Sequence, residues 1–419
     1  MRKLITKISK YRNLIYLISG VIIFVASVIL GAHNASLYDP SQGFDGAPHV
    51  YYVKYIYENR QIPPPDQYET HQPPLYYIIS AMVLSVFQDI KSIQYVNVVV
   101  LWMIIGVAVL GLNKIFKNRN QVFLGMLSLA ALPMLNIFPP TVTNELLNTF
   151  WIISAFVSCL YLASAKNDKE YTRYFLFLML SLILGIWTKV TIISIIPAVI
   201  ITIFISTKNL KKSSIYSAIC LVVFALAYAP IYFRAATSGS PSNIVHTASK
   251  IIVQRSPDFY YRLDWIPKVD MYTTQYYSFL GGAWNSFWSD GHNVITPFVP
   301  FHKKAFILWS LGFLLLPISL YGLWQLFRNN KKVAYIMLLV DLTMIGFYVL
   351  YNMVSNHYSA VRLTYEMGIV LPYAFGIAAA GKNKKILPVL FVLLAIQFII
   401  LVSFFWILPW WFVTQPKAL

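Results

Sequence analysis

The stretch K-I-L-P-V-L-F-V-L-L-A-I-Q-F-I-I-L-V-S-F-F-W-I-L, residues 385–408, decides the fold. After its first lysine it contains no charged residue, and a helix needs about 20 apolar residues to cross a bilayer. Further apolar runs near this length lie at about 12–31, 93–113, 121–138, 145–164, 172–187, 189–206, 215–232, 305–327, 333–352 and 365–381. The sequence therefore predicts an all-α polytopic membrane protein with about 11 transmembrane helices.

The composition excludes the soluble classes. Of the 419 residues, 58% are hydrophobic and only 11% are charged, against roughly 25% charged in a soluble domain. The mean hydropathy is +0.62. Two cysteines, both inside apolar runs, cannot build a disulfide scaffold. We expect lipid to cover much of residues 1–419, which we take as a single transmembrane domain.

The net charge of +18 would suggest a nucleic-acid partner in a soluble protein. Here most basic residues flank the apolar runs, as the positive-inside bias requires, so we expect no nucleic acid. Twenty of the 33 basic residues fall in six clusters: Arg2/Lys3/Lys7/Lys10/Arg12, Lys114/Lys117/Arg119, Lys166/Lys169/Arg173, Lys208/Lys211/Lys212, Arg328/Lys331/Lys332 and Lys382/Lys384/Lys385. The first cluster precedes a run without a small-residue cleavage site, which predicts a membrane anchor with a cytoplasmic N-terminus.

Parity decides the role of a twelfth, shorter apolar run, residues 74–88. All six basic clusters share one side only if this run does not cross, so we predict that it lies in or near the outer interface. Two large outer loops then follow, 32–92 and 233–304, and the tail 409–419 lies on the same side.

Polar chemistry concentrates in the first of these loops. Five of the 15 acidic residues and three of the seven histidines lie within residues 32–72. Residues 47–59 suit an amphipathic interfacial helix with aromatic anchors. Asp45 stands just after the outer end of the first span, beside that helix. A carboxylate there can meet a lipid-borne substrate as a general base.

The pattern F-D-x-x-x-H-x-x-Y-V-x-Y-I … P-P … Y-E-x-H-Q-P-P-L-Y-Y, within residues 44–77, resembles the first outer loop of C-type (GT-C) glycosyltransferases. The similarity is to the group of protein O-mannosyltransferases and aminoarabinose transferases, which use polyprenyl-phosphate-linked sugars. It implies a GT-C-like bundle with interfacial helices in the loop 32–92, and a catalytic role for the whole domain. The family usually has an Asp-Glu pair where this chain has Asp45-Gly46, so an acid expected of a metal site is missing.

Two further motifs match landmarks of the family, and Arg362 stands where members have a basic or aromatic group, although this chain shows no sharp motif there. Asn144 and Glu145 open a span, where Asn can also cap the helix and Glu can favour its positive end. Lys189, in G-I-W-T-K-V, either contacts a phosphate or only extends to the interface. Arg362 suits a lipid phosphate, or else pairs with Glu366 one turn further on.

The resemblance implies an inverting glycosyltransferase at the outer face of the cell membrane. Asp45 would take the proton from the acceptor hydroxyl. The donor phosphate would bind Lys189, Arg362 and His71. Glu145, Asn144, Glu69 and His49 would bind the acceptor or a divalent ion, although no cofactor is required. The partners are then membrane lipid, a polyprenyl-phosphate-linked sugar and an acceptor lipid, glycan or protein.

Two other functions fit the layout. An O-antigen ligase or polymerase also has 10–12 spans, and it would depend on arginines of the late loop such as Arg255 and Arg262. A transporter of lipid-linked glycans would need inverted repeats and broken helices near the midplane, and the sequence contains no visible repeat. The concentration of polar residues at one face favours an interfacial enzyme.

Overall fold

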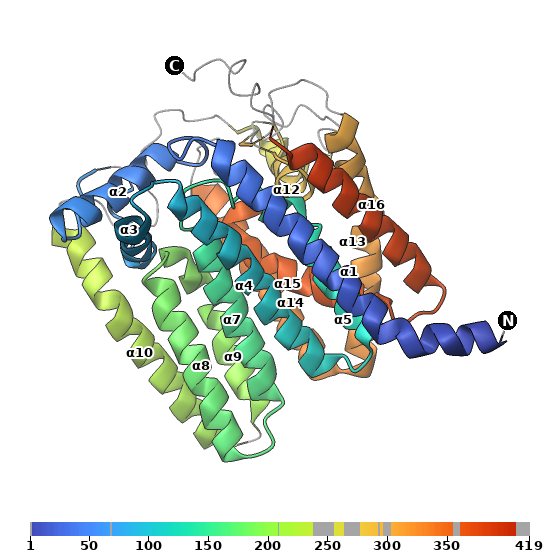
Figure 1. Cartoon of the computed structure of the whole chain (residues 1–419). Helices are drawn as coiled ribbons and strands as arrows, with labels where there is room; N and C mark the ends of the chain where they lie inside the picture. Colours follow the sequence, from blue (N-terminus) through green and yellow to red (C-terminus); the bar gives the residue numbers. More distant parts are fainter. Residues whose placement is uncertain are drawn as a thin grey trace.

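The computed structural model describes residues 2–67, 69–207, 209–237, 255–263, 277–291, 294–295, 303–354 and 361–407, and no strand occurs among them. The first half contains α1 Arg2–Leu37, α2 Gly46–Asn59, α3 Leu75–Phe87, α4 Ser92–Ile115, α5 Arg119–Ala130, α6 Pro133–Asn136, α7 Glu145–Ala163, α8 Asp168–Ile186, η1 Val190–Ile195 and α9 Ile196–Ser206. The second half contains α10 Leu210–Thr237, η2 Pro257–Tyr260, α12 Phe279–Trp288, α13 Lys303–Asn329, α14 Lys331–Val354, η4 Leu363–Ile369, α15 Val370–Ala380 and α16 Ile386–Phe405 (Figure 1).

The predicted fold class is confirmed, since every predicted apolar run falls on one helix or on two successive helices. Eight helical segments of the described chain are long and apolar enough to cross a membrane. The other three predicted spans fall on α5, α8 and α9. Pro133 follows the 12-residue α5 and starts a new short helix, α9 has 11 residues, and α8 begins with charged residues. How many of these three cross the bilayer stays a prediction.

Burial separates central helices from peripheral ones. The apolar window of Leu363–Ala380 is 89% buried, whereas those of α1, α10 and α16 are each 22% buried. The peripheral helices present their leucine, isoleucine and valine side chains outward, which suits contact with lipid. At the centre, α13 and α15 approach closely, because a Cβ on Gly322 would lie 1.8 Å from the carbonyl oxygen of Gly376.

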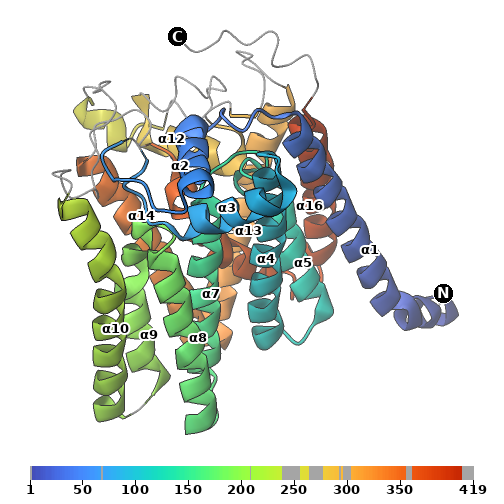
Figure 2. The ribbon, with the colours of Figure 1, turned by 60° about the vertical axis from the view of Figure 1, so that its left-hand side comes forward.

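The basic clusters share one end of the bundle, here called the basic end. Lys332 of the α13–α14 turn donates to the Ala163 carbonyl at the end of α7. Lys212 at the start of α10 pairs with Asp168 at the start of α8. Figure 2 shows the α4–α5, α7–α8 and α9–α10 turns together at this end, with α2, α3 and α12 at the opposite end. Lys208 lies outside the described residues.

The opposite end, here called the site end, carries the loop 32–92. The predicted interfacial helix 47–59 is α2, and it packs on α3. With 13 residues, α3 is about 20 Å long, which is shorter than the bilayer core. The amide of Leu75 at its start donates to the Trp187 carbonyl at the end of α8, so α3 begins at the site end.

Buried amides fasten the loops of the site end to the bundle. Gln94 of α4 donates to the carbonyl of Tyr38 at 3.2 Å, and Asn97 donates to that of Thr141 at 2.6 Å. At the end of α1, Asn34 is hydrogen-bonded through both amide atoms to the end of α16. These hydrogen bonds hold the loop Tyr38–Asp45 against the helices of the bundle.

Much of the predicted outer loop 233–304, and all of the tail 409–419, lie outside the described residues.

Candidate active site

Asp45 immediately precedes α2 and has a left-handed backbone, with φ 54° and ψ 32°. Such a conformation costs a residue with a Cβ on the order of 1 kcal/mol and often marks a functional position. Asp45 stands at the helix N-cap, yet its half-buried side chain makes no capping hydrogen bond. Helix capping therefore does not explain why Asp45 adopts this energetically unfavourable backbone conformation.

Gly46 explains the departure from the Asp-Glu pair of the resembled family. A Cβ at this position would lie 2.8 Å from the Pro40 carbonyl oxygen and 2.9 Å from the carbonyl carbon of Ser41. Both are backbone atoms of the same tight loop, so they cannot move aside as a flexible side chain would. This packing leaves no room for a second acidic side chain beside Asp45.

Lys189 and Glu145 form a buried ion pair. Lys189 is extended between α8 and η1, and only 8% of the residue is exposed. It therefore does not extend to solvent, and its ammonium instead donates to Glu145, the first residue of α7. Asn144 makes no helix cap but donates to the carbonyl of Thr188, and Asn148 donates to the hydroxyl of Thr191. Asn144 and Asn148, at the start of α7, thus hold in place the turn that carries Lys189.

Arg362 provides a second buried cation. Its guanidinium donates through both Nε (3.0 Å) and Nη2 to the hydroxyl of Tyr365. It also lies 4.5 Å from the centre of the Phe44 ring and 4.6 Å from that of Tyr365. For the alternative partner, Glu366, neither carboxylate oxygen has a hydrogen-bond partner among the described residues. The arginine is therefore held by contacts with two aromatic rings.

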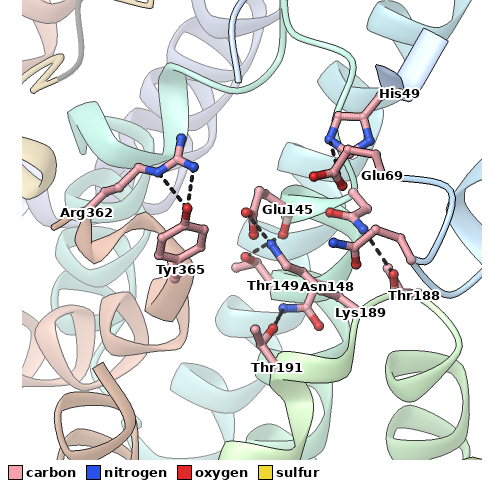
Figure 3. Close-up of polar contacts among 12 residues, drawn as sticks. His49, Glu69, Glu145, Asn148, Thr149, Thr188, Lys189, Thr191, Arg362 and Tyr365 are labelled. Carbon is pink, nitrogen blue, oxygen red and sulfur yellow. Dashed lines mark hydrogen bonds and ion pairs between the residues drawn. The ribbon is translucent and has the colours of Figure 1, made fainter. Parts of the chain in front are cut away.

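His49 and Glu69 form the third part of the site. His49 lies one turn into α2, and its Nδ1 is 2.8 Å from the hydroxyl of Tyr77. Its Nε2 is 3.9 Å from a carboxylate oxygen of Glu69, another residue with a left-handed backbone, at φ 64°. Figure 3 shows this pair, the Glu145–Lys189 pair and the Arg362–Tyr365 pair grouped at one place.

Electrostatics links Asp45 to Arg362 and to the His49–Glu69 pair, and these same groups also interact with Lys189 or Glu145. Burial, together with the nearby Asp45 carboxylate, raises the pKa of Glu69 to about 7, against an opposing effect of Lys189. Burial lowers the pKa of His49 to about 4, and Asp45 opposes that change. Burial also lowers the pKa of Arg362, but Tyr365 and Asp45 more than compensate and raise it overall. Segments far apart in sequence thus meet in one cluster of charges.

Glu69 should make stability depend on pH. Because folding raises its pKa from 4.5 to about 7, it contributes stability that is complete below pH 4.5 and is lost as pH rises through 7. The shift corresponds to about 3 kcal/mol. In Glu69→Gln, thermal unfolding in detergent should not show this loss of stability with rising pH. The free energy of unfolding of the wild type minus that of the variant should therefore fall between pH 4.5 and 7. The exposed Glu58→Gln should match the wild type, and a difference that is flat with pH would contradict the assignment.

Two predicted roles receive less support from the geometry. His71 is buried beside Gln72, whose amide nitrogen lies 3.4 Å away, and its role as a phosphate ligand stays a prediction. Within the described ranges, no three histidine, cysteine or acidic side chains converge as metal ligands do. Glu145 faces a lysine ammonium instead. These residues do not form a metal-ligand set, so we derive no step through a metal.

Phe44 and Tyr365, whose rings both contact Arg362, were not predicted from the sequence. A signal for Tyr365 existed, because it follows the arginine by three residues in R-L-T-Y-E. Phe44 gave a weaker signal, since an aromatic residue next to Asp45 in a membrane protein suggests only an interface anchor. Their contact with Arg362 joins positions 318 residues apart (362 − 44), which no local pattern can reveal.

Comparisons with known proteins identify the class. The structure of ArnT from Cupriavidus metallidurans bound to undecaprenyl phosphate is similar, with a TM-score of 0.56 and 13% identity over 87% of this chain. The oligosaccharyltransferase of Archaeoglobus fulgidus, in the apo form, has a TM-score of 0.61 and 14% identity over 96% of this chain. The chain is a membrane protein with the GT-C glycosyltransferase fold, which the resemblance of its first loop predicted.

Part of the chain also matches the model of a protein family. Residues 71–233 match the model of the dolichyl-phosphate-mannose-protein mannosyltransferase family. This range includes Asn144, Glu145 and Lys189, although it excludes Asp45 and Arg362. No curated protein sequence matches the chain. The chain covers 60% of the ArnT chain and 56% of the oligosaccharyltransferase chain, so it is shorter than either.

Proposed function

We propose that this protein is an inverting glycosyltransferase that moves a sugar from polyprenyl phosphate to an acceptor hydroxyl at the outer face of the membrane. The observation that carries the proposal is the grouping of Asp45 with two buried cations, Lys189 and Arg362. Both cations lie near the Tyr365 ring, at 5.2 and 4.6 Å from its centre, and Arg362 also contacts Phe44, the residue before Asp45. They meet at the end of the bundle opposite the basic clusters. The GT-C fold and the undecaprenyl phosphate bound to ArnT support the class of donor.

In the proposed reaction, Asp45 accepts the proton of the acceptor hydroxyl while that oxygen attacks the anomeric carbon. The bond between this carbon and the phosphate oxygen breaks, and polyprenyl phosphate leaves with the electron pair. Negative charge therefore develops on the phosphate in the transition state. Lys189 and Arg362 are the cations positioned to stabilise it, with His71 as a further phosphate ligand.

The remaining residues bind or orient. Glu145 and Asn144 fix Lys189 and its turn, through the ion pair and through the contact with Thr188. Glu69 and His49 lie beside Asp45, where carboxyl and imidazole groups can hydrogen-bond acceptor hydroxyls. Buried cations fixed by such contacts need little reorganisation when the phosphate gains charge. The site therefore combines one proton acceptor with a preorganised anion pocket.

A deletion strain tests this function. Mass spectrometry of its lipids and glycans should show a polyprenyl-phosphate sugar in excess and one glycan modification missing. Expression of the wild-type chain should reverse both changes. Unchanged lipids and glycans would contradict a transferase, and movement of a lipid-linked glycan by the purified protein without a covalent product would favour a transporter.

The outer-face orientation can be tested by labelling with a membrane-impermeant maleimide. Asp66→Cys, in the exposed loop between α2 and α3, should react in intact cells. Lys169→Cys, exposed at the basic end, should react only after permeabilisation. The native Cys159 and Cys220 are fully buried, so the wild-type chain serves as an unreactive control. The reverse labelling pattern would place the site at the cytoplasmic face.

The arginines that a ligase-type enzyme would need have structural contacts here. Arg255 donates to the Asn352 carbonyl near the end of α14 and lies 4.7 Å from the Phe259 ring. Arg262 pairs with Asp258 one turn earlier at a partly exposed position. Neither contact belongs to the cluster around Asp45, so the described structure favours the Asp45-based reaction.

A further inference from the structure

Arg234, in the last turn of α10, holds the loop that precedes α3. Its guanidinium donates to three backbone carbonyls: those of Pro63 at 2.7 Å, Thr70 at 2.6 Å and Gln72 at 3.3 Å. Pro63 lies near the start of the loop, and the other two lie near its end. One side chain from a membrane-spanning helix therefore closes the loop on itself.

The loop closed in this way carries Glu69. Its left-handed backbone, at φ 64°, is costly for a residue with a Cβ and persists only when its surroundings enforce it. The carbonyl of the next residue, Thr70, is bound by Arg234. The Thr70 hydroxyl and the Gln67 backbone also bind each other, at 2.8 and 3.1 Å. Arg234 thus fixes the backbone directly beside the strained glutamate.

A second set of contacts leads from Arg234 to His49. The guanidinium lies 5.9 Å from the centre of the Tyr52 ring, and the Tyr52 hydroxyl donates to the same Gln72 carbonyl that Arg234 binds. Tyr52 stacks on Tyr77, with ring centres 3.8 Å apart and an interplanar angle of 11°. The Tyr77 hydroxyl in turn contacts His49. Both partners of the His49–Glu69 pair are therefore supported from Arg234.

We propose that Arg234 is a positioning residue, which holds Glu69 and His49 against Asp45 for reaction with the acceptor. This rests on the proposed transferase function. Arg234 binds loop carbonyls, whereas Lys189 and Arg362 are the cations placed for the donor phosphate. Its loss should therefore reduce turnover more than donor binding. The positive-inside bias favours basic residues at the basic end of a span. An arginine at the site end therefore indicates a specific role.

The contacts require arginine and not only a positive charge. A guanidinium offers five donors in a planar fork, so it can bind several carbonyls and face an aromatic ring together. A lysine ammonium is a single point with three donors and cannot reach carbonyls on both sides of the loop with the same geometry. Arg234→Lys should therefore recover only part of the effect of Arg234→Gln.

The test uses the full chain in nanodiscs, with two readouts for Arg234→Gln and Arg234→Lys. Hydrogen exchange of the segment 67–75 should accelerate about tenfold or more in Arg234→Gln, while α7 keeps its protection. Turnover should fall by about 10²-fold, the effect of a small misplacement of reacting groups. Affinity for undecaprenyl phosphate should stay within about threefold of the wild type. Arg234→Lys should give intermediate exchange and turnover.

Arg328→Gln is the matched control, since Arg328 also ends a long helix and lies 4.9 Å from the centre of an aromatic ring, that of Trp324, but at the basic end. It should match the wild type in both readouts. Wild-type exchange in Arg234→Gln, or lost affinity for undecaprenyl phosphate with unchanged exchange, would overturn the proposal. If Arg234→Gln does not fold, Arg234→Lys decides by the same criteria. A wild-type chain without transfer would refute the proposed function, while the exchange data would still show whether Arg234 holds the loop.

Discussion

Asp45→Asn is expected to reduce sugar transfer by about 10³-fold, because general-base catalysis contributes about 10²–10⁴-fold to such reactions. Asparagine has the same shape as aspartate but cannot accept the proton of the acceptor hydroxyl. It also tolerates the left-handed backbone at this position, so the loop should keep its conformation. Transfer in membranes, measured with a labelled donor, gives the result.

The control for this variant is Asp66→Asn, which changes an exposed carboxylate of the same loop, residues 32–92. It should leave transfer unchanged. Binding of undecaprenyl phosphate by Asp45→Asn should persist, since Lys189 and Arg362 remain in place. Full transfer activity in Asp45→Asn would remove the carboxylate from the reaction and with it the proposed mechanism.

Lys189→Met is expected to destabilise the protein by about 3–5 kcal/mol, because it leaves the Glu145 carboxylate buried without its counter-charge. The side chains of Lys189 and Glu145 are only 10% and 9% exposed, so solvent cannot replace the lost partner. Thermal unfolding in detergent measures this effect. Lys212→Met, which breaks the exposed pair with Asp168 at the basic end, should cost at most about 1 kcal/mol.

The double variant Glu145→Gln/Lys189→Met separates folding from function. Removing both charges should restore most of the lost stability, since no uncompensated charge remains. It should not restore transfer or binding of undecaprenyl phosphate, because the cation is absent. Recovery of transfer in the double variant would show that the ion pair serves the fold alone.

The sequence was sufficient for the bundle, because each spanning helix is encoded by an uninterrupted apolar run such as 385–408. It also located Asp45 and the helix α2, since a polar loop after the first span is a local feature. The three short helices were less predictable. The run 121–138 is continuous in hydropathy, yet Pro133 divides it into α5 and α6.

Most partnerships within the site could not be predicted, because they join residues distant in sequence. Glu145 and Lys189 are 44 residues apart, and the capping role considered for Asn144 gave way to its contact with Thr188 across the same distance. Arg362 bound Tyr365 and not Glu366, although both lie within one turn of it. The choice depends on the backbone of η4, which has non-helical angles at Glu366.

The central claim is that the site end binds polyprenyl phosphate between the two buried cations. The structure of the full chain in nanodiscs with undecaprenyl phosphate tests it most directly. The phosphate should lie within hydrogen-bond distance of Lys189 and Arg362, and the Asp45 carboxylate should face it across the space that the sugar of the donor would occupy. A phosphate bound at the basic end, or at the site end without contact to either cation, would contradict it.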